Sequence, residues 1–125
     1  MAKGHAQTLQ LHEGVKLVAI ADTVEDNRKK AEEQYGVKTY CTGEELIDAG
    51  GLDAVFVVVP TYLHAPLAIR ALEAGCHVFC EKPMALNTDL CQQMIDAADK
   101  SGKILMIGQV LRFWPEYVLD RKSVV

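Results

Sequence analysis

Short apolar runs alternate with amphipathic or charged segments along the 125 residues of this chain. The apolar runs are too short for helices and are typical of buried strands, whereas the segments between them have the length and spacing of helices. Glycine or proline follows almost every segment, where a helix or a strand is expected to stop. Strands are predicted over residues 15–21, 37–40, 52–59, 78–80 and 103–107, and helices over residues 2–12, 23–35, 43–49, 64–74 and 88–101.

Strict alternation of strand and helix with short connections predicts the fold class: an α/β domain with a Rossmann-type doubly wound parallel sheet and helices on both faces. The run 15–21 is almost continuously apolar, so we expect a strand that is buried on both faces. The chain contains no internal repeat, linker or low-complexity stretch. The length is that of one domain.

Polar residues follow each long strand of the predicted sheet, at the edge where ligands bind in folds of this class. One of these groups, Glu81-Lys82-Pro83, has two interpretations. Either Lys82 faces the crevice and touches a substrate or cofactor, or Glu81 and Lys82 form a surface pair that carries little energy. The complete set of residues at or just beyond the strand ends is Asp22; Pro60, Thr61 and His64; Glu81, Lys82 and Pro83; and Gly108, Gln109 and Arg112.

Asp22 stands where a dinucleotide fold bonds the adenosine ribose hydroxyls. A carboxylate there would repel the 2′-phosphate of NADP, so NAD is favoured, although Arg28 close by would moderate that repulsion. The other interpretation of Asp22 is an N-cap of the following helix, and the two roles are compatible. His64 likewise has a structural alternative, as a first-turn residue of its helix.

The net charge of −4 leaves no basic cluster, which argues against a nucleic-acid-binding face. No apolar run reaches membrane-spanning length, and residues 1–5 lack the apolar core of a secretory signal. We therefore expect no membrane partner and a cytoplasmic location. The cysteines show no metal-ligand spacing, so reduced thiols and no metal site are expected at Cys41, Cys76, Cys80 and Cys91.

A dinucleotide fold opens with a strand and a G-x-G-x-x-G/A turn before its first helix, whereas this chain begins inside that helix. We expect that strand and glycine-rich loop to be encoded upstream of Met1, which is then an internal methionine. Without the strand, the edges of strands 15–21 and 52–59 face each other unpaired. Either the two strands close up and pair, or the domain is marginally folded and prone to aggregation. Each unpaired buried group costs about 1–3 kcal/mol, against a total stability of about 5–15 kcal/mol.

Several segments, in order and spacing, resemble the N-terminal half of the glucose-fructose oxidoreductase / inositol dehydrogenase / rhizopine-catabolism (Gfo/Idh/MocA) family. The resemblance covers residues 2–117. Its pieces are Gly4-His5-Ala6, Val15 to Asp22, Leu52-Asp53-Ala54-Val55, Pro60 to His64, Ala71 to Gly75, Glu81-Lys82-Pro83 and Gly108 to Phe113.

The resemblance implies a nicotinamide-dependent oxidoreductase acting on sugars, inositols or related polyols. It places Lys82 beside the nicotinamide as the catalytic residue that hydrogen-bonds the reacting oxygen, with Glu81 on the nicotinamide ribose or holding Lys82. It also implies a turn fixed by Pro83 through a cis peptide. The implied cofactor-binding residues are Asp22, Pro60, Thr61, His64, Glu81, Lys82, Pro83 and Arg112, while the histidines interpreted as structural are His5, His12 and His77.

The expected organisation is a partial NAD(P)-binding Rossmann domain over residues 1–117 and a short tail over 118–125. Members of the family carry a further domain that forms most of the sugar pocket and mediates oligomerisation. Because that domain is missing here, we expect the chain alone to be inactive. The alternatives are a non-catalytic nucleotide-binding or pairing module and an inactive gene fragment.

Overall fold

The computed structural model describes residues 2–115, so the predicted tail over 118–125 lies outside the described residues. The predicted succession of helices and strands is confirmed. Two 3₁₀ turns, η1 (Thr61–Leu63) and η2 (Val110–Phe113), were not among the predicted elements. The other elements are α1 (Ala2–Leu11), β1 (Ala19–Ala21), α2 (Glu25–Tyr35), β2 (Lys38–Tyr40), α3 (Gly43–Asp48), β3 (Ala54–Val57), α4 (His64–Glu73), β4 (His77–Glu81), α5 (Thr88–Ser101) and β5 (Leu105–Gly108).

Local chemistry sets the ends of these helices. Thr42 and Asn87 precede α3 and α5, and their side chains accept the backbone N–H groups of the third residue beyond, which satisfies one otherwise unpaired donor of each helix. Gly36 ends α2 with φ 64°, a left-handed conformation that glycine adopts without the steric cost of a Cβ atom.

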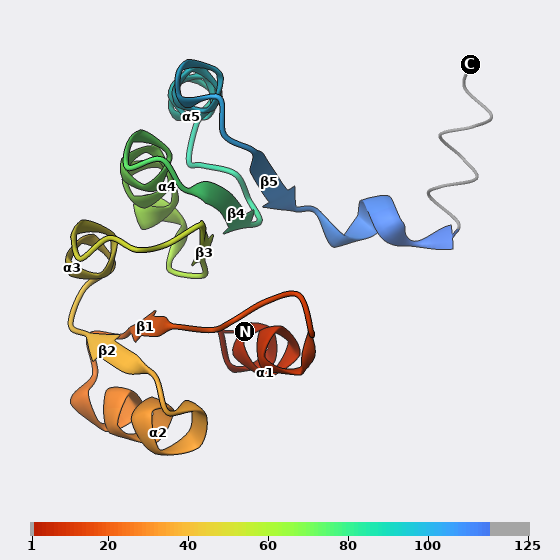
Figure 1. Ribbon diagram of the computed structural model, residues 1–125. Helices are drawn as coiled ribbons and strands as arrows, with labels where there is room; N and C mark the ends of the chain where they lie inside the picture. Colours follow the sequence, from red (N-terminus) through yellow and green to blue (C-terminus); the bar gives the residue numbers. More distant parts are fainter. Residues whose placement is uncertain (1, 116–125) are drawn as a thin grey trace.

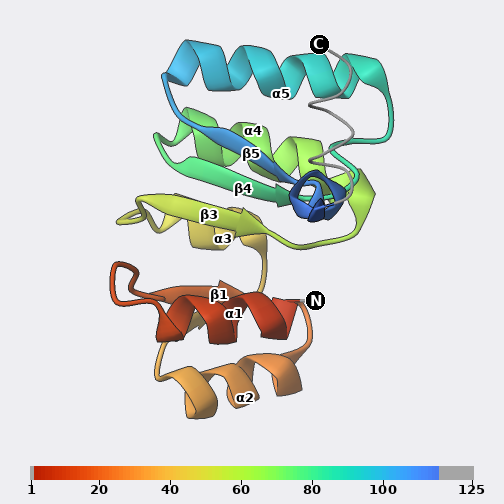
Figure 2. The ribbon, with the colours of Figure 1, turned by 90° about the vertical axis from the view of Figure 1, so that its right-hand side faces the viewer.

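All observed strand pairs are parallel, as predicted for this α/β fold, but the described strands form two sheets. One sheet is β1–β2 and the other is β3–β4–β5. No described strand lies between β1 and β3, whose edges face each other in Figures 1 and 2. Of the two alternatives, the one in which these strands close up and pair is therefore wrong. Residues 15–18 lie outside β1, because the partner strand β2 offers only three residues to the ladder.

The core lies between β3–β4–β5 and the helices α3, α4 and α5, which cover one face of the strands, while α1 lies on the opposite face (Figures 1 and 2). Strand β4 alternates between the two faces. Val78 and Cys80 are buried against the helices, and His77, Phe79 and Glu81 point the other way. This alternation decides which side chains of β4 can reach α1.

The face of the sheet toward α1 is only partly covered in the described residues. Phe56, Phe79 and Met106 lie side by side across β3, β4 and β5 on this face, and Phe56 and Met106 remain 39% and 43% exposed. Val18, just before β1, is 42% exposed. The predicted burial of residues 15–21 on both faces is therefore wrong, because the described elements cover this side only in part.

The facing edges of β1 and β3 lead to a test of stability. We expect the chain to melt over a broad temperature range and to scatter light as it self-associates, because unpaired strand edges template contacts with other chains. Ala54→Lys, which places a charge on the open edge strand β3, should reduce the scattering. Ala49→Lys adds the same charge at the end of α3 and should not. A sharp two-state melt of a soluble monomer would contradict this expectation.

Candidate functional site

A cavity of about 490 Å³ opens at the carboxyl ends of β3 and β4. Because the two strands are parallel and in register, the loops that follow them meet at the same edge of the sheet. The volume lies within the ~300–1,000 Å³ typical of small-molecule sites. The cavity is lined by Val58, Val59, Pro60, Thr61, His64, Glu81 and Lys82, so five of the residues chosen from the sequence are brought together.

The loop after β3 turns immediately into a helix. Pro60 interrupts the strand direction and its carbonyl accepts the N–H of Leu63 at 2.9 Å, which closes η1. His64 then begins α4. The Thr61 hydroxyl makes no hydrogen bond within the described part of the chain, so it remains available to a ligand in the cavity.

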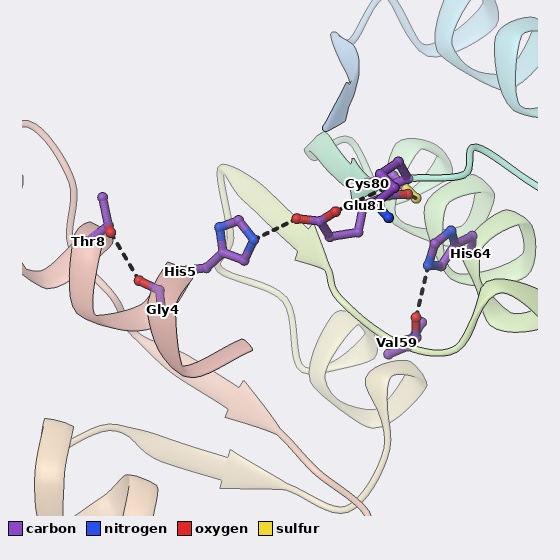
Figure 3. Close-up of polar contacts among 8 residues, drawn as sticks. Gly4, His5, Thr8, Val59, His64, Cys80 and Glu81 are labelled. Carbon is purple, nitrogen blue, oxygen red and sulfur yellow. Dashed lines mark hydrogen bonds and ion pairs between the residues drawn. The ribbon is translucent and has the colours of Figure 1, made fainter. Parts of the chain in front are cut away.

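His64 ties together the two loops that line the cavity. Its side chain is almost fully buried, with Nδ1 2.7 Å from the Pro83 carbonyl. Nε2 lies 2.9 Å from the Val59 carbonyl (Figure 3). A neutral imidazole can donate to only one of these oxygens, whereas the protonated ring can donate to both. His64 is thus both a first-turn residue of α4, as its structural alternative held, and part of the cavity wall.

Glu81 ends β4, and its carboxylate is held from two sides. His5 Nε2 donates to Oε1 at 2.8 Å (Figure 3). The backbone N–H of Lys82 donates to Oε2 at 3.1 Å. Burial alone would raise the pKa of this carboxyl, but the bonds from His5 and Lys82, with their nearby charges, hold the pKa below its ordinary value. Glu81 is therefore a carboxylate at neutral pH.

Lys82 presents an exposed side chain at the cavity and makes no ion pair within residues 2–115. Glu81 binds the Lys82 backbone and His5, so the surface ion pair between Glu81 and Lys82 is not formed. The peptide bond between Lys82 and Pro83 is cis, as the resemblance implied. Pro83 does not line the cavity, but its carbonyl is one of the two acceptors facing His64.

Asp22 and Arg112 lie outside this cavity. Asp22 follows β1, in the other sheet, and its carboxylate accepts from the Val24 N–H at 2.8 Å and from Asn27 Nδ2 at 3.0 Å. The N-cap of α2 is Val24, so the N-cap interpretation of Asp22 is wrong. Arg28 donates to the Asp22 carbonyl at 2.8 Å and thus lies beside it, as the sequence suggested.

Arg112 lies on η2, in the segment that leads away from the sheets after β5 in Figure 1. The resemblance implied that Arg112 binds the cofactor. The structure does not bring it among the residues that line the cavity.

His5 is the site residue that sequence reasoning missed. It was interpreted as structural, yet it extends from the first turns of α1 to the Glu81 carboxylate. Its only signal was its place in the Gly4-His5-Ala6 piece of the resemblance. By contrast, His12 and His77 each accept a backbone N–H, from Gly14 and Ile104, which fits the structural role expected for them.

The four cysteines are free, and no group of metal-ligating side chains is arranged around a common point within residues 2–115. Burial, with a smaller contribution from the Glu81 charge, raises the pKa of the Cys80 thiol to about 12, so this thiol stays protonated. The helices in the described residues are too short or too polar to cross a membrane.

Residues 1–109 match the sequence profile of the Gfo/Idh/MocA family, described as an oxidoreductase family with an NAD-binding Rossmann fold. The chain belongs to this family. The resemblance found from the sequence is thereby confirmed, together with the Rossmann-type fold class.

Relatives in the family support this assignment. Myo-inositol 2-dehydrogenase from Thermotoga maritima is 39% identical over 110 residues, which cover 87% of this chain and 33% of that protein. The crystal structure of myo-inositol 2-dehydrogenase from Lactobacillus plantarum superposes with a TM-score of 0.86 at 33% identity, over 98% of this chain and 37% of the other. The crystal structure of the WlbA dehydrogenase from Bordetella pertussis, in complex with NADH and UDP-GlcNAcA, superposes with a TM-score of 0.88 at 29% identity. The match covers 98% of this chain and 36% of the other. The chain spans about a third of the length of the curated relatives it matches.

Because Gly108 of β5 has no side chain, Phe79 and Glu81 can occupy the space beside it. A Cβ atom there would lie 2.8 Å from Phe79 Cζ and 3.4 Å from Glu81 Oε2. We expect Gly108→Ala to lower the free energy of unfolding by about 1–3 kcal/mol, the usual cost of overpacking. Gly4→Ala in α1 meets no atom within 4 Å and is the matched control, expected to be neutral or stabilising. Equal denaturant midpoints for the two variants would contradict the close packing at Gly108.

Proposed function

We propose that this chain is the cofactor-binding part of a nicotinamide-dependent oxidoreductase that acts on a sugar, an inositol or a related polyol. The observation that carries the proposal is the exposed Lys82 side chain, without an ion-pair partner in the described residues, at a cavity beyond the ends of two parallel strands. The names of the relatives, myo-inositol 2-dehydrogenase among them, support this substrate class.

Lys82 handles the proton of the reacting oxygen. When a substrate alcohol is oxidised, its carbon loses a hydride and its oxygen loses a proton, which the Lys82 amine accepts; in the reverse direction the ammonium returns it. NAD, when bound, supplies the hydride acceptor. The Lys82 N–H donor also stabilises the negative charge that develops on the substrate oxygen. This stabilisation depends on the direction in which the Lys82 side chain points into the cavity.

The residues present fit the cofactor at both ends. The Asp22 carboxylate would hold the adenosine ribose, because each of its oxygens has a further lone pair beyond the one used by Val24 or Asn27. Thr61, with its free hydroxyl, and Glu81 would lie along the cavity toward the nicotinamide. We also propose that the protein acts in the cytoplasm, which its four free cysteines support.

The preference for NAD over NADP can be measured directly. In fluorescence titrations of the chain, NADH should bind about tenfold more tightly than NADPH, because the Asp22 carboxylate repels the 2′-phosphate. Asp22→Ala should bring the two affinities together, and Asp99→Ala on α5 should leave the ratio unchanged. Absence of NADH binding up to millimolar concentration would refute the cofactor role and leave the inactive fragment.

Catalysis by Lys82 requires a substrate pocket, so we test it in a chimera. Residues 2–109 replace the matching third of the Thermotoga maritima myo-inositol 2-dehydrogenase, and NADH production from myo-inositol is followed. Lys82→Met should lower kcat about 10²–10⁴-fold while the affinity for NADH stays within about twofold. Lys100→Met, on α5, is the control for removal of a positive charge. Full turnover by Lys82→Met would contradict the proposal, and turnover by the isolated chain would exclude a purely non-catalytic module.

A further inference from the structure

The His5 ring is held by aromatic packing as well as by its hydrogen bond. Its centroid lies 6.1 Å from that of Phe56 on β3 and 5.4 Å from that of Phe79 on β4, and these two rings stack on each other at 4.9 Å. Tilted ring contacts at such distances favour a defined orientation. The packing therefore sets the direction in which Nε2 points, toward the end of β4 (Figure 3).

The Glu81 carboxylate links the His5 ring to the backbone of the next residue, Lys82. A carboxylate can only accept hydrogen bonds, so His5 Nε2 carries the proton and donates it. The second oxygen accepts the backbone N–H of Lys82. With a donor on each oxygen, the carboxylate cannot rotate freely, and the peptide plane from which the Lys82 side chain departs is fixed with it.

We propose that His5 is a positioning residue for Lys82: through Glu81 it fixes the backbone from which the lysine reaches into the cavity. The inference rests on the proposed function of Lys82. His5 itself does not line the cavity, so its effect on a ligand passes through Glu81. The chain of contacts joins the first turns of α1 to the loop that carries the proposed catalytic group, although His5 and Glu81 are 76 residues apart.

Two substitutions separate the hydrogen bond from the ring packing. His5→Phe keeps an aromatic ring against Phe56 and Phe79 but removes the donor. His5→Gln loses the ring but places an amide N–H close to the position of Nε2. If His5 acts through the bond, His5→Phe disturbs Lys82 and His5→Gln restores it; a role in packing alone predicts the reverse order.

The readouts are the amide proton shift of Lys82 and the titration of the Glu81 carboxyl, both followed by NMR on the full chain, together with the affinity for NADH. The titratable groups facing Glu81 are His5 on α1 and its neighbours Cys80 and Lys82, and Cys80 stays protonated throughout because its pKa is about 12. In His5→Phe the Lys82 amide should move upfield and the Glu81 titration should move to higher pH. NADH should bind about three- to tenfold more weakly, because the Glu81 carboxylate itself lines the cavity and loses its fixed orientation.

His5→Gln should return all three readouts toward wild type. Unchanged Lys82 and Glu81 signals in His5→Phe, or equal disturbance by both variants, would overturn the proposal. If His5→Phe does not fold, the wild-type chain provides the test. As Glu81 is protonated, the His5 Nε2 and Lys82 amide signals should shift with one common midpoint, and independent midpoints would refute the coupling.

The two proposals fail in different ways. The NMR readouts require no cofactor, so a wild-type chain that ignores NADH yet shows the His5 effects would refute the proposed function and retain the positioning of Lys82. A chain that binds NADH equally well in wild type and His5→Phe, with a displaced Lys82 amide, would refute the effect on ligand binding.

Discussion

The carboxylate at the end of β4 is the point on which three parts of the molecule depend. Glu81 accepts from a helix residue on one side and from the next backbone amide on the other, so α1, the strand and the loop carrying Lys82 are joined at one group. Such bonds are stronger than those between neutral groups because the acceptor is charged. The low pKa of Glu81 ensures that this acceptor is ionised at neutral pH.

The geometry around this carboxylate comes from the strand itself. Alternation along β4 buries Val78 and Cys80 against the helices and turns Phe79 and Glu81 to the side of α1. The neighbouring strand β5 has a glycine, Gly108, next to Phe79 and Glu81. Any side chain at this position would occupy the space of those two residues. On the other side of the loop, the buried His64 ring lies between the carbonyls of Val59 and Pro83, within hydrogen-bond distance of each. The cavity wall is thus built from backbone groups that are bound to the protein, while Lys82 and Thr61 remain available.

Much of this arrangement could be predicted from the sequence, because it follows from local pattern. Apolar runs ending in Pro60 or in Glu81-Lys82-Pro83 mark strands that stop, and parallel topology then brings their ends to one edge. The contact of His5 with Glu81 could not be predicted in this way, since it depends on how α1 lies on the sheet. The lengths of the strands could not be predicted for a related reason. Residues 15–18 are apolar except for Lys16, but a strand extends only as far as its partner does. The position of Asp22 directly after β1 was predicted correctly. Its role as the N-cap of α2 was not, because Val24 is the N-cap and the Asp22 carboxylate accepts the Val24 N–H.

The division of the strands into two sheets has a consequence for how the molecule opens. β1 and β2 share no ladder with β3–β4–β5, and they are joined to the larger unit mainly by packing of α3 against β1, β2 and α4. Cooperative units of this kind exchange their amide hydrogens at different free energies. The β1–β2 unit carries Asp22, and the three-stranded unit carries Lys82. Within the described residues the two ends of the proposed cofactor site therefore lie in different sheets, and we expect the amides around Asp22 and those around Lys82 to exchange at different free energies.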